Sequence, residues 1–226
     1  MKQLYKVLLV DDHPLIVEAY RRALDQVSIL NEKEIEFDIN MANCCDSAMA
    51  KLNESKLGLP YDIIFLDISL PPCKDGKILS GLDLGIKIRE EFESIKIMVA
   101  TTYNDGFMIT SITKSFNPDG FMVKSDLTLS KLVQAIKTLV SGSPYYSKTV
   151  LEIMRKQFAN DFYVDNIDRK ILYELSKGTK MNELPNVLPL SIAALERRKR
   201  ILKDIFNVSG KGDRDLLKLA QNKGFI

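Results

Sequence analysis

Five short apolar runs alternate with amphipathic stretches over residues 1–140. The runs are YKVLLV, IEFDINMA, DIIFLDI, KIMVATT and GFMVK, and a stretch of helical periodicity follows each of them. Strands that alternate with helices in this way form a parallel sheet with helices on both faces. We therefore predict a five-stranded, parallel, doubly wound domain, in which ligands bind beyond the carboxyl ends of the strands.

The remainder of the chain has a different pattern. Residues 141–147, SGSPYYS, have the Gly, Ser and Pro content of a domain edge, and a connecting helix is expected over residues 148–160. The last segment contains three helical patterns and no convincing strand. A chain of 226 residues suits two small domains. We expect a doubly wound domain over 1–140, a linker over 141–160 and a small all-α domain over 161–226.

Charge is distributed unequally between the two expected domains. Residues 1–140 contain 16 Lys and Arg against 20 Asp and Glu, whereas residues 161–226 contain 13 against 9. The first domain is therefore acidic and the second basic, which indicates an anionic partner for the second.

Composition excludes several classes of protein. Three cysteines and one histidine give neither a disulfide framework nor zinc-ligand spacing, so Cys44, Cys45 and Cys73 are interpreted as reduced thiols. The sequence has no uncharged apolar stretch of about 18 residues and no signal-peptide pattern at its start. A cytoplasmic protein without a membrane partner is expected.

Carboxylates lie at the ends of two predicted strands. Asp11 and Asp12 follow the first strand, and Asp67 ends the third. If these strands are neighbours, three carboxylates converge at one edge of the sheet, where mutual repulsion raises their pKa values. A hard divalent cation such as Mg²⁺ removes that penalty, because it prefers oxygen ligands.

Two further strand ends complete a candidate site. Thr101 offers a hydroxyl group at the end of the fourth strand, and Lys124 offers a cation at the end of the fifth. Together with the acids they suit phosphoryl transfer, with Asp67 as a nucleophile that forms an aspartyl phosphate. A single acid at a strand end is more often a turn or helix cap, but a set over four strands favours a site. His13 is interpreted as a helix-start residue beside it.

The order and spacing of these motifs resemble the receiver domain of bacterial response regulators. The resemblance covers residues 3–140 through VLLVDDHP, FLDISLP with the following GLDL, VATTYND and GFMVKSD. It implies a flavodoxin-like fold and a sensor histidine kinase as phosphoryl donor. By this resemblance, Asp67 is the phospho-acceptor, and Mg²⁺ is held by Asp11, Asp12, Asp67 and the carbonyl of Ser69. The resemblance also implies that Thr101 and Lys124 contact the phosphoryl group. Phe121 corresponds to the aromatic residue that reorients when Thr101 moves.

The loop after the acceptor is longer than in this family. Residues 72–80 form the insertion within PPCKDGKILSG, between Pro71 and Gly81. Lengthening a surface loop costs little free energy, so a tolerated insertion is the simpler interpretation. The alternative is that the insertion modifies kinase choice or phosphoryl lifetime, because it borders the site.

The basic C-terminal segment has the pattern of a helix-turn-helix. An amphipathic helix over residues 165–178 stops at Gly178, and a second helix begins after Ser191 with the basic run RRKR. A basic second helix suits entry into a DNA major groove, although by charge alone RRKR is more often a solvated helix face.

The order of motifs over residues 161–226 is similar to the four-helix DNA-binding domain of NarL/LuxR-type regulators. Ala193, Ala194 and Glu196 depart from it, standing where that family commonly carries Lys and Thr, and Pro185 and Pro189 interrupt the preceding helix. Alanine side chains cannot hydrogen-bond to bases, and Glu196 repels phosphate unless it accepts from a cytosine amino group. The expected contacts with DNA are Lys180, Ser191, Arg197, Arg198, Lys199 and Arg200.

The leading hypothesis is a two-component response regulator that is not an enzyme. Phosphorylation of Asp67 favours a homodimer whose C-terminal domains bind double-stranded DNA and regulate transcription. One alternative keeps the receiver but makes the C-terminal domain a protein-interaction module without DNA binding. A second is an Asp-nucleophile phosphohydrolase, although Ser69 stands where those enzymes usually carry a second acid.

Overall fold

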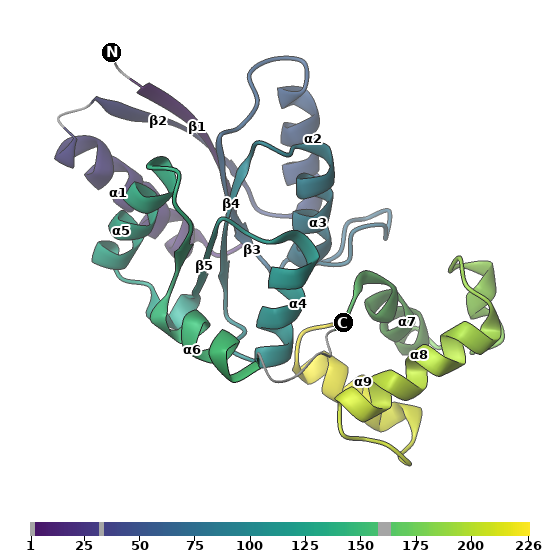
Figure 1. Ribbon diagram of the computed structural model, residues 1–226. Helices are drawn as coiled ribbons and strands as arrows, with labels where there is room; N and C mark the ends of the chain where they lie inside the picture. The colour runs from purple at the N-terminus through teal and green to yellow at the C-terminus, as the bar shows by residue number, and fades with distance from the viewer. Residues whose placement is uncertain (1–2, 32–33, 158–163) are drawn as a thin grey trace. The chain divides into compact units, whose positions relative to one another are not determined.

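A computed structural model describes residues 3–31, 34–157 and 164–226 (Figure 1). The chain forms two compact units. One comprises Met1–Asn104 and Phe116–Glu152, and the other comprises Asp105–Ser115 and Ile153–Ile226. The expected domain boundaries at residues 140 and 160 stay a prediction. Residues 158–163, where the expected linker meets the expected C-terminal domain, lie outside the described residues.

Among the described residues, six strands form one parallel sheet in the order β2-β1-β3-β4-β5-β6. The strands are β1 (Gln3–Val10), β2 (Ile35–Ala42), β3 (Ile63–Asp67), β4 (Lys96–Thr101), β5 (Gly120–Val123) and β6 (Tyr145–Tyr146). The five apolar runs are strands as predicted, and the parallel α/β class is confirmed. Since β1 and β3 are neighbours, the ends that carry Asp11 and Asp67 lie side by side, with Val10 opposite Leu66.

The prediction of five strands was wrong by one. Tyr145 and Tyr146 lie inside the expected linker, but they pair in parallel with Gly120 and Phe121 of β5. The Tyr146 hydroxyl donates to the carbonyl of Pro118 at 2.9 Å and fixes this edge. Two residues are too few to show a strand periodicity, and their Gly, Ser and Pro neighbours indicate a turn.

Helices follow the strands of the sheet. They are α1 (Pro14–Leu30), α2 (Cys45–Ser55), α3 (Gly81–Glu91), α4 (Gly106–Phe116) and α5 (Leu129–Val140). Helices α1 and α5 pack against each other, and their apolar faces share one buried cluster with alternate residues of the central strands. Figure 1 shows α2 and α3 on the opposite side of the sheet from α1 and α5. The sheet is therefore covered on both faces, as its nearly continuous apolar strands require.

The rest of the described chain is helical after β6. It contains α6 (Lys148–Gln157), α7 (Asn166–Ser176), the 3₁₀ turn η2 (Leu184–Asn186), α8 (Ile192–Ile205) and α9 (Asp213–Asn222). The predicted caps are present: Ser191 accepts from the N–H of Ala194, and Gly178 has φ of +91° after α7. Leu195 and Leu202 of α8 and Phe206 directly after it are buried.

The segment before α8 contains a single 3₁₀ turn in place of a second long helix. Pro185 lies inside η2, and Pro189 follows it. Because proline has no backbone N–H, neither residue can donate the hydrogen bond that the interior of an α-helix needs. The predicted all-α character of this region is confirmed, but the helix before the basic helix is reduced to one turn.

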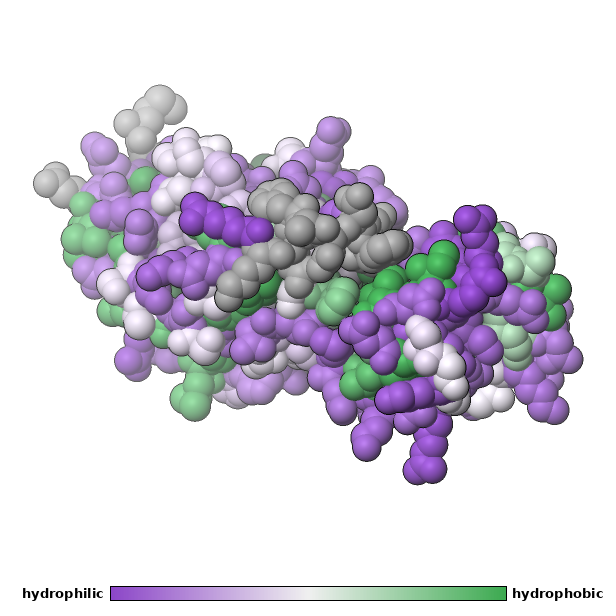
Figure 2. Space-filling view, turned by 60° about the horizontal axis from the view of Figure 1, so that its bottom comes forward, coloured by the Kyte–Doolittle hydropathy of each residue, from purple (hydrophilic) through white to green (hydrophobic). Residues whose placement is uncertain are grey.

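The surface carries most of the charged residues, and the face in Figure 2 is largely hydrophilic with scattered hydrophobic patches. Within residues 3–31, 34–157 and 164–226, none of the helices has the length and apolar character needed to cross a membrane.

Candidate functional site

The acids at the strand ends converge as predicted. One ligand atom from each of Asp11, Asp12, His13 and Asp67 lies within 4.8 Å of the others. Asp11 and Asp67 are buried, whereas the Asp12 side chain is 40% exposed and keeps the cluster open to solvent. The end of the sheet therefore presents a compact set of oxygen donors.

Lys124 lies between two acids of this cluster. Its Nζ atom is 2.8 Å from Asp11 Oδ2 and 2.8 Å from Asp67 Oδ2. The side chain is only 8% exposed, so both ion pairs are shielded from water. The chain turns into a short 3₁₀ helix at Lys124, directly after β5. The residue predicted at the end of the fifth strand thus reaches the acids from the first and third.

Burial and charge shift the pKa values of these groups. Burial raises the pKa of Asp67 above its ordinary value, although hydrogen bonds from Lys124 and from the N–H of Ser69 act in the opposite direction. Burial tends to lower the pKa of Lys124, but its hydrogen bonds to Asp11 and Asp67 outweigh that effect and raise it. One lysine thus does not fully offset the cost of ionising Asp67.

Three more predicted residues lie on or directly after strands β3, β4 and β5. The Ser69 N–H donates to Asp67 Oδ1 at 3.0 Å. Thr101 ends β4 and is fully buried, and its hydroxyl oxygen accepts from the N–H of Tyr103 at 3.2 Å. Phe121, on β5, is also fully buried. Ser69 and Thr101 therefore lie with Asp67 at the carboxyl edge of the sheet, and Phe121 lies within the strand next to Thr101.

The donor set fits a hard divalent cation. Three carboxylates provide oxygen ligands, and two of them, Asp11 and Asp67, are buried with Lys124 between them. This acidic pocket is consistent with a divalent metal site.

His13, interpreted from the sequence as a helix-start residue beside the site, is the N-cap of α1, and its Nδ1 lies 2.6 Å from Asp12 Oδ1 and 3.2 Å from Asp11 Oδ1. Thr102 and the steric role of Gly81 were not singled out from the sequence. The hydroxyl groups of Thr102 and Ser69 are 3.2 Å apart. Gly81 is required sterically, because a Cβ atom there would lie 1.9 Å from the carbonyl oxygen of Asp67. The repeated Thr in VATTYND was the available signal for Thr102.

Ion pairs inside the C-terminal unit engage two of the four cations of the basic run on α8. The Arg198 guanidinium donates to Asp165 at 2.7 Å and to Asp168 at 2.8 Å, at the start of α7. Lys199 pairs with Asp213 at 2.9 Å, at the start of α9. These two cations therefore join α8 to the neighbouring helices.

The other predicted contact residues face solvent. Arg197 and Arg200 are exposed on α8, and Lys180 is exposed in the segment before it. Ser191 is exposed, and its hydroxyl oxygen accepts from the N–H of Ala194 at 3.4 Å as the cap of α8. Glu196 is exposed beside Arg197. The exposed charged residues of α8 are therefore two arginines, Arg197 and Arg200, and two acids, Glu196 and Asp204.

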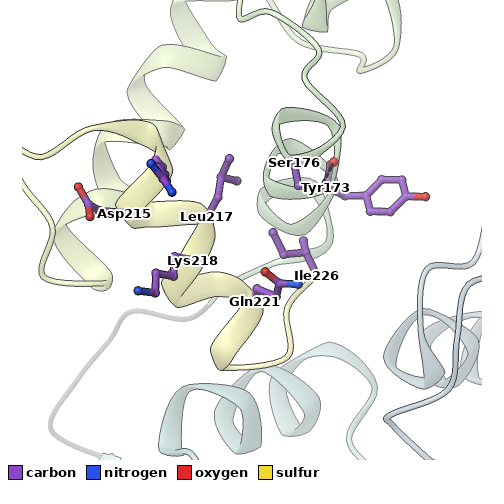
Figure 3. A pocket seen from close by; sticks show the side chains of 8 residues that line it. Tyr173, Ser176, Asp215, Leu217, Lys218, Gln221 and Ile226 are labelled. Carbon is purple, nitrogen blue, oxygen red and sulfur yellow. Dashed lines mark hydrogen bonds between the residues drawn. The ribbon is translucent and has the colours of Figure 1, made fainter.

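A groove of about 920 Å³ lies between α7 and α9. Figure 3 shows the side chains that line it, and they mix polar and apolar groups: Tyr173, Ser176, Arg214, Asp215, Leu217, Lys218, Gln221 and Ile226. None of the predicted site residues lines this groove.

Comparison with protein families assigns the N-terminal part of the chain. The response regulator receiver domain matches residues 7–137, which is more than half of the sequence. The transcriptional regulatory protein MctR of Rhizobium johnstonii is 24% identical, over 98% of this chain and 95% of its own length. The response regulator UvrY of Escherichia coli is also 24% identical, over 96% of this chain and 94% of its own length.

Solved structures resemble the whole chain. RcsB of Salmonella enterica serovar Typhimurium, bound to the promoter rprA in the presence of phosphomimetic BeF₃⁻, has a TM-score of 0.67 at 20% identity and covers 97% of this chain and 99% of its own. A structure of two RcsB dimers bound to two parallel DNAs has a TM-score of 0.59 at 19% identity, covering 98% and 99%. At this identity the similarity shows the fold, and it extends over both parts of the chain.

Proposed function

This chain belongs to the response regulator family through its receiver domain, and on that basis we propose that it is a two-component response regulator of the NarL/LuxR type. A sensor histidine kinase supplies the phosphoryl group, and phosphorylation favours a homodimer that binds double-stranded DNA and regulates transcription. The observation that carries the proposal is the position of Asp67, buried beside Asp11 and Asp12 and joined to Lys124.

Phosphoryl transfer uses the groups gathered around Asp67. A carboxylate oxygen of Asp67 attacks phosphorus as the bond to the donor's leaving group breaks. Lys124 holds its charge 2.8 Å from Asp67 and stabilises the negative charge of the transferred group. The Thr101 hydroxyl donates a hydrogen bond to a phosphoryl oxygen.

We propose Mg²⁺ as the cation of this site. Asp11, Asp12 and Asp67 would hold it through carboxylate oxygens, together with the carbonyl of Ser69. When bound, Mg²⁺ offsets the repulsion among the acids and neutralises charge on the phosphoryl oxygens.

Thr101 and Phe121 form the proposed switch. Once the phosphoryl group is present, Thr101 moves toward it, and Phe121 follows because it lies on the adjacent strand, with Thr101 opposite Val123 in the register. The phosphoryl group thereby favours one of two receiver states.

Phosphoryl uptake from acetyl phosphate tests the receiver. The full-length chain with Mg²⁺ should gain the mass of one phosphoryl group, and the peptide containing Asp67 should carry it. Addition of a chelator should abolish the gain. Labelling that persists with the chelator, or on another peptide, would contradict the proposed site.

Binding of DNA is supported by the exposed cations of the C-terminal unit. Arg197, Arg200 and Lys180 are available for bases or phosphates, whereas Arg198 and Lys199 are held in ion pairs. We propose that Arg197 and Arg200 make the principal contacts from α8, and that Ser191 contributes by capping the helix that carries them.

Selection of duplexes from a random pool tests this output. The protein is used with and without acetyl phosphate, and the selected duplex is then titrated over a salt series. A repeated half-site that binds more tightly after phosphorylation, with a steep negative salt slope, is the expected result. No enrichment by protein shown by mass to be phosphorylated would reject DNA binding.

A protein-interaction output is the second candidate. It is favoured by one observation: of the four consecutive cations on α8, two are engaged inside the unit, and Glu196 lies beside the exposed ones. This candidate predicts a salt-insensitive interaction with a protein and no binding of duplex DNA.

We propose a regulator rather than an enzyme. Ser69 stands where Asp-nucleophile phosphohydrolases usually carry a second acid, so turnover of small phosphate esters is expected to be absent beyond slow self-dephosphorylation. The predicted domain limits of 1–140, 141–160 and 161–226 and a cytoplasmic location are part of the same proposal.

A further inference from the structure

The insertion after the phospho-acceptor is an ordered turn. The N–H of Cys73 donates to the carbonyl of Ile78 at 2.8 Å, and the N–H of Gly76 donates to the carbonyl of Cys73 at 3.0 Å. Gly76 has φ of +67°, a conformation that favours glycine. The side chains of Cys73 and Ile78 are buried. The segment therefore closes on itself and directs its apolar side chains inward.

Two carboxylates attach this turn to the neighbouring helices. Asp46, in the first turn of α2, accepts from the N–H of Lys74 at 3.2 Å. Asp83, in the first turn of α3, accepts from the N–H of Leu79 at 2.8 Å. The position of Cys73 is thus fixed from both sides.

These attachments bring the buried Cys73 to the start of α2, where Cys45 lies. Cys45 is the first residue of α2 and is fully buried, and the two thiols lie close enough to affect each other's pKa. Both cysteines are in the thiol form. Cys44 differs from them: it is the N-cap residue of α2 and is partly exposed, and hydrogen bonding with Ser47 lowers its pKa.

We propose that Cys45 and Cys73 form an oxidative modification site, at which a two-electron oxidant joins the insertion to α2 through a disulfide bond. The two thiols release two protons and two electrons as the S–S bond forms. A diazene oxidant such as diamide takes up both and becomes a hydrazine, and hydrogen peroxide yields two molecules of water.

The environment of the pair makes this modification slow to form and slow to reverse. Burial raises the pKa of Cys73 to about 11, and it raises that of Cys45 further. Since the thiolate is the attacking species, the rate of disulfide formation increases roughly tenfold for each pH unit between pH 7 and pH 9. A thiol of high pKa is also a poor leaving group, so reduction of the bond is slow.

The disulfide would act next to the phospho-acceptor. The insertion is followed by Gly81, whose N–H donates to the carbonyl of Ile68 at 3.1 Å, and which packs closely against the carbonyl of Asp67. A covalent bond from the insertion to α2 restricts the movement of this segment. The inferred consequence, which rests on the proposed function, is a changed lifetime of the phosphoryl group on Asp67.

The bond is tested in the full-length Cys44→Ser chain, which lacks the more reactive thiol. Treatment with diamide should remove two hydrogen masses from the chain and produce a linked pair of peptides that contain Cys45 and Cys73. The variants Cys44→Ser/Cys45→Ser and Cys44→Ser/Cys73→Ser should show no such loss. Recovery of both thiols as alkylated residues after treatment of Cys44→Ser would overturn the inference.

Differential alkylation of the unsubstituted chain keeps the test independent of how the variants fold. After treatment with diamide, Cys45 and Cys73 should both be protected from alkylation, and a strong reductant should reverse this protection. A product in which Cys73 alone is protected, as a mixed or intermolecular disulfide, would contradict the pairing.

Phosphoryl lifetime separates this inference from the proposed function. The phosphorylated chain is prepared in the reduced and the oxidised form, and loss of the phosphoryl mass is followed over time. At least a twofold difference in half-life is expected, and equal half-lives would reject the regulatory consequence. If the linked peptides form but neither form takes up phosphoryl, the proposed function fails while the modification site stands.

Discussion

Asp67 and Asp213 both pair with lysine, but their pKa values move in opposite directions. Asp67 is buried at the end of β3, where burial raises its pKa despite the hydrogen bond from Lys124. Asp213 begins α9 in partial contact with solvent, where the hydrogen bond from Lys203 lowers its pKa and exceeds the effect of burial. The first carboxylate is costly to ionise and gains from an added cation, whereas the second already has its partners.

The same contrast separates the two groups of candidate residues. At the edge of the sheet, the acids and Lys124 face one shared space. On α8, consecutive cations point in different directions, and Arg198 and Lys199 serve to hold helices together. A charged residue therefore indicates a ligand site when its neighbours leave its charge uncompensated, and an internal ion pair when they compensate it.

The largest expected effect is at Asp67. The substitution Asp67→Asn removes the nucleophilic carboxylate, so phosphoryl uptake from acetyl phosphate should fall below detection by mass spectrometry. Asp75→Asn, at the exposed tip of the insertion, is the matched control and should label as the unsubstituted chain does. Labelling of Asp67→Asn at an unchanged rate would place the acceptor elsewhere and remove the contrast between the two carboxylates.

Arg198 tests whether the basic run includes a structural member. Arg198→Ala leaves Asp165 and Asp168 without their shared cation, and hydrogen bonds to charged groups contribute about 1.5–3 kcal/mol. We expect a loss of about 2 kcal/mol in the unfolding free energy of the C-terminal unit, measured by urea titration. Arg197→Ala, one position earlier and exposed, should leave the urea midpoint unchanged. Equal midpoints for the two variants would show that Arg198 has no structural role.

The exposed arginines give a smaller effect, confined to DNA binding. The double variant Arg197→Ala/Arg200→Ala should bind the selected duplex about tenfold more weakly. Its salt slope should fall by about 2, because each phosphate contact contributes about 0.9. Arg214→Ala, exposed on α9, is the control and should retain the slope. Unchanged binding by the double variant would favour the protein-interaction output.

The sequence was sufficient to predict where these side chains come together, because the residues end strands. A parallel sheet brings all carboxyl ends to one edge, so Asp11, Asp67, Thr101 and Lys124 had to be neighbours once the strands were recognised. Strand β6 was missed because two residues carry no periodicity, and its pairing depends on β5.

The contacts of α8 could not be predicted in the same way. Helical periodicity gives the face on which a residue lies, but the partners of Arg198 and Lys199 come from α7 and α9, whose packing is set by distant apolar residues. The proximity of Cys73 to Cys45 could not be predicted for the same reason, since it depends on how the insertion folds back onto α2.

Substitution of Asp213 gives the smallest expected change in stability, and the lowered pKa of Asp213 fixes the direction of its pH dependence. Because its pKa in the folded protein lies below the ordinary value of 3.8, its ion pairs with Lys203 and Lys199 stabilise the fold above about pH 4, and this contribution is lost as the pH falls through the folded pKa. The pair is partly exposed, so Asp213→Asn should lower the unfolding free energy by only about 0.2–1 kcal/mol at pH 7. The difference from the unsubstituted chain should shrink between pH 4 and pH 3, as measured by urea midpoints.

Asp215→Asn, exposed on the same helix, is the control and should show less pH dependence of this kind. A difference for Asp213→Asn that is as large at pH 3 as at pH 7 would mean that the carboxylate acts through packing or helix capping, and that charge compensation does not distinguish it from Asp67.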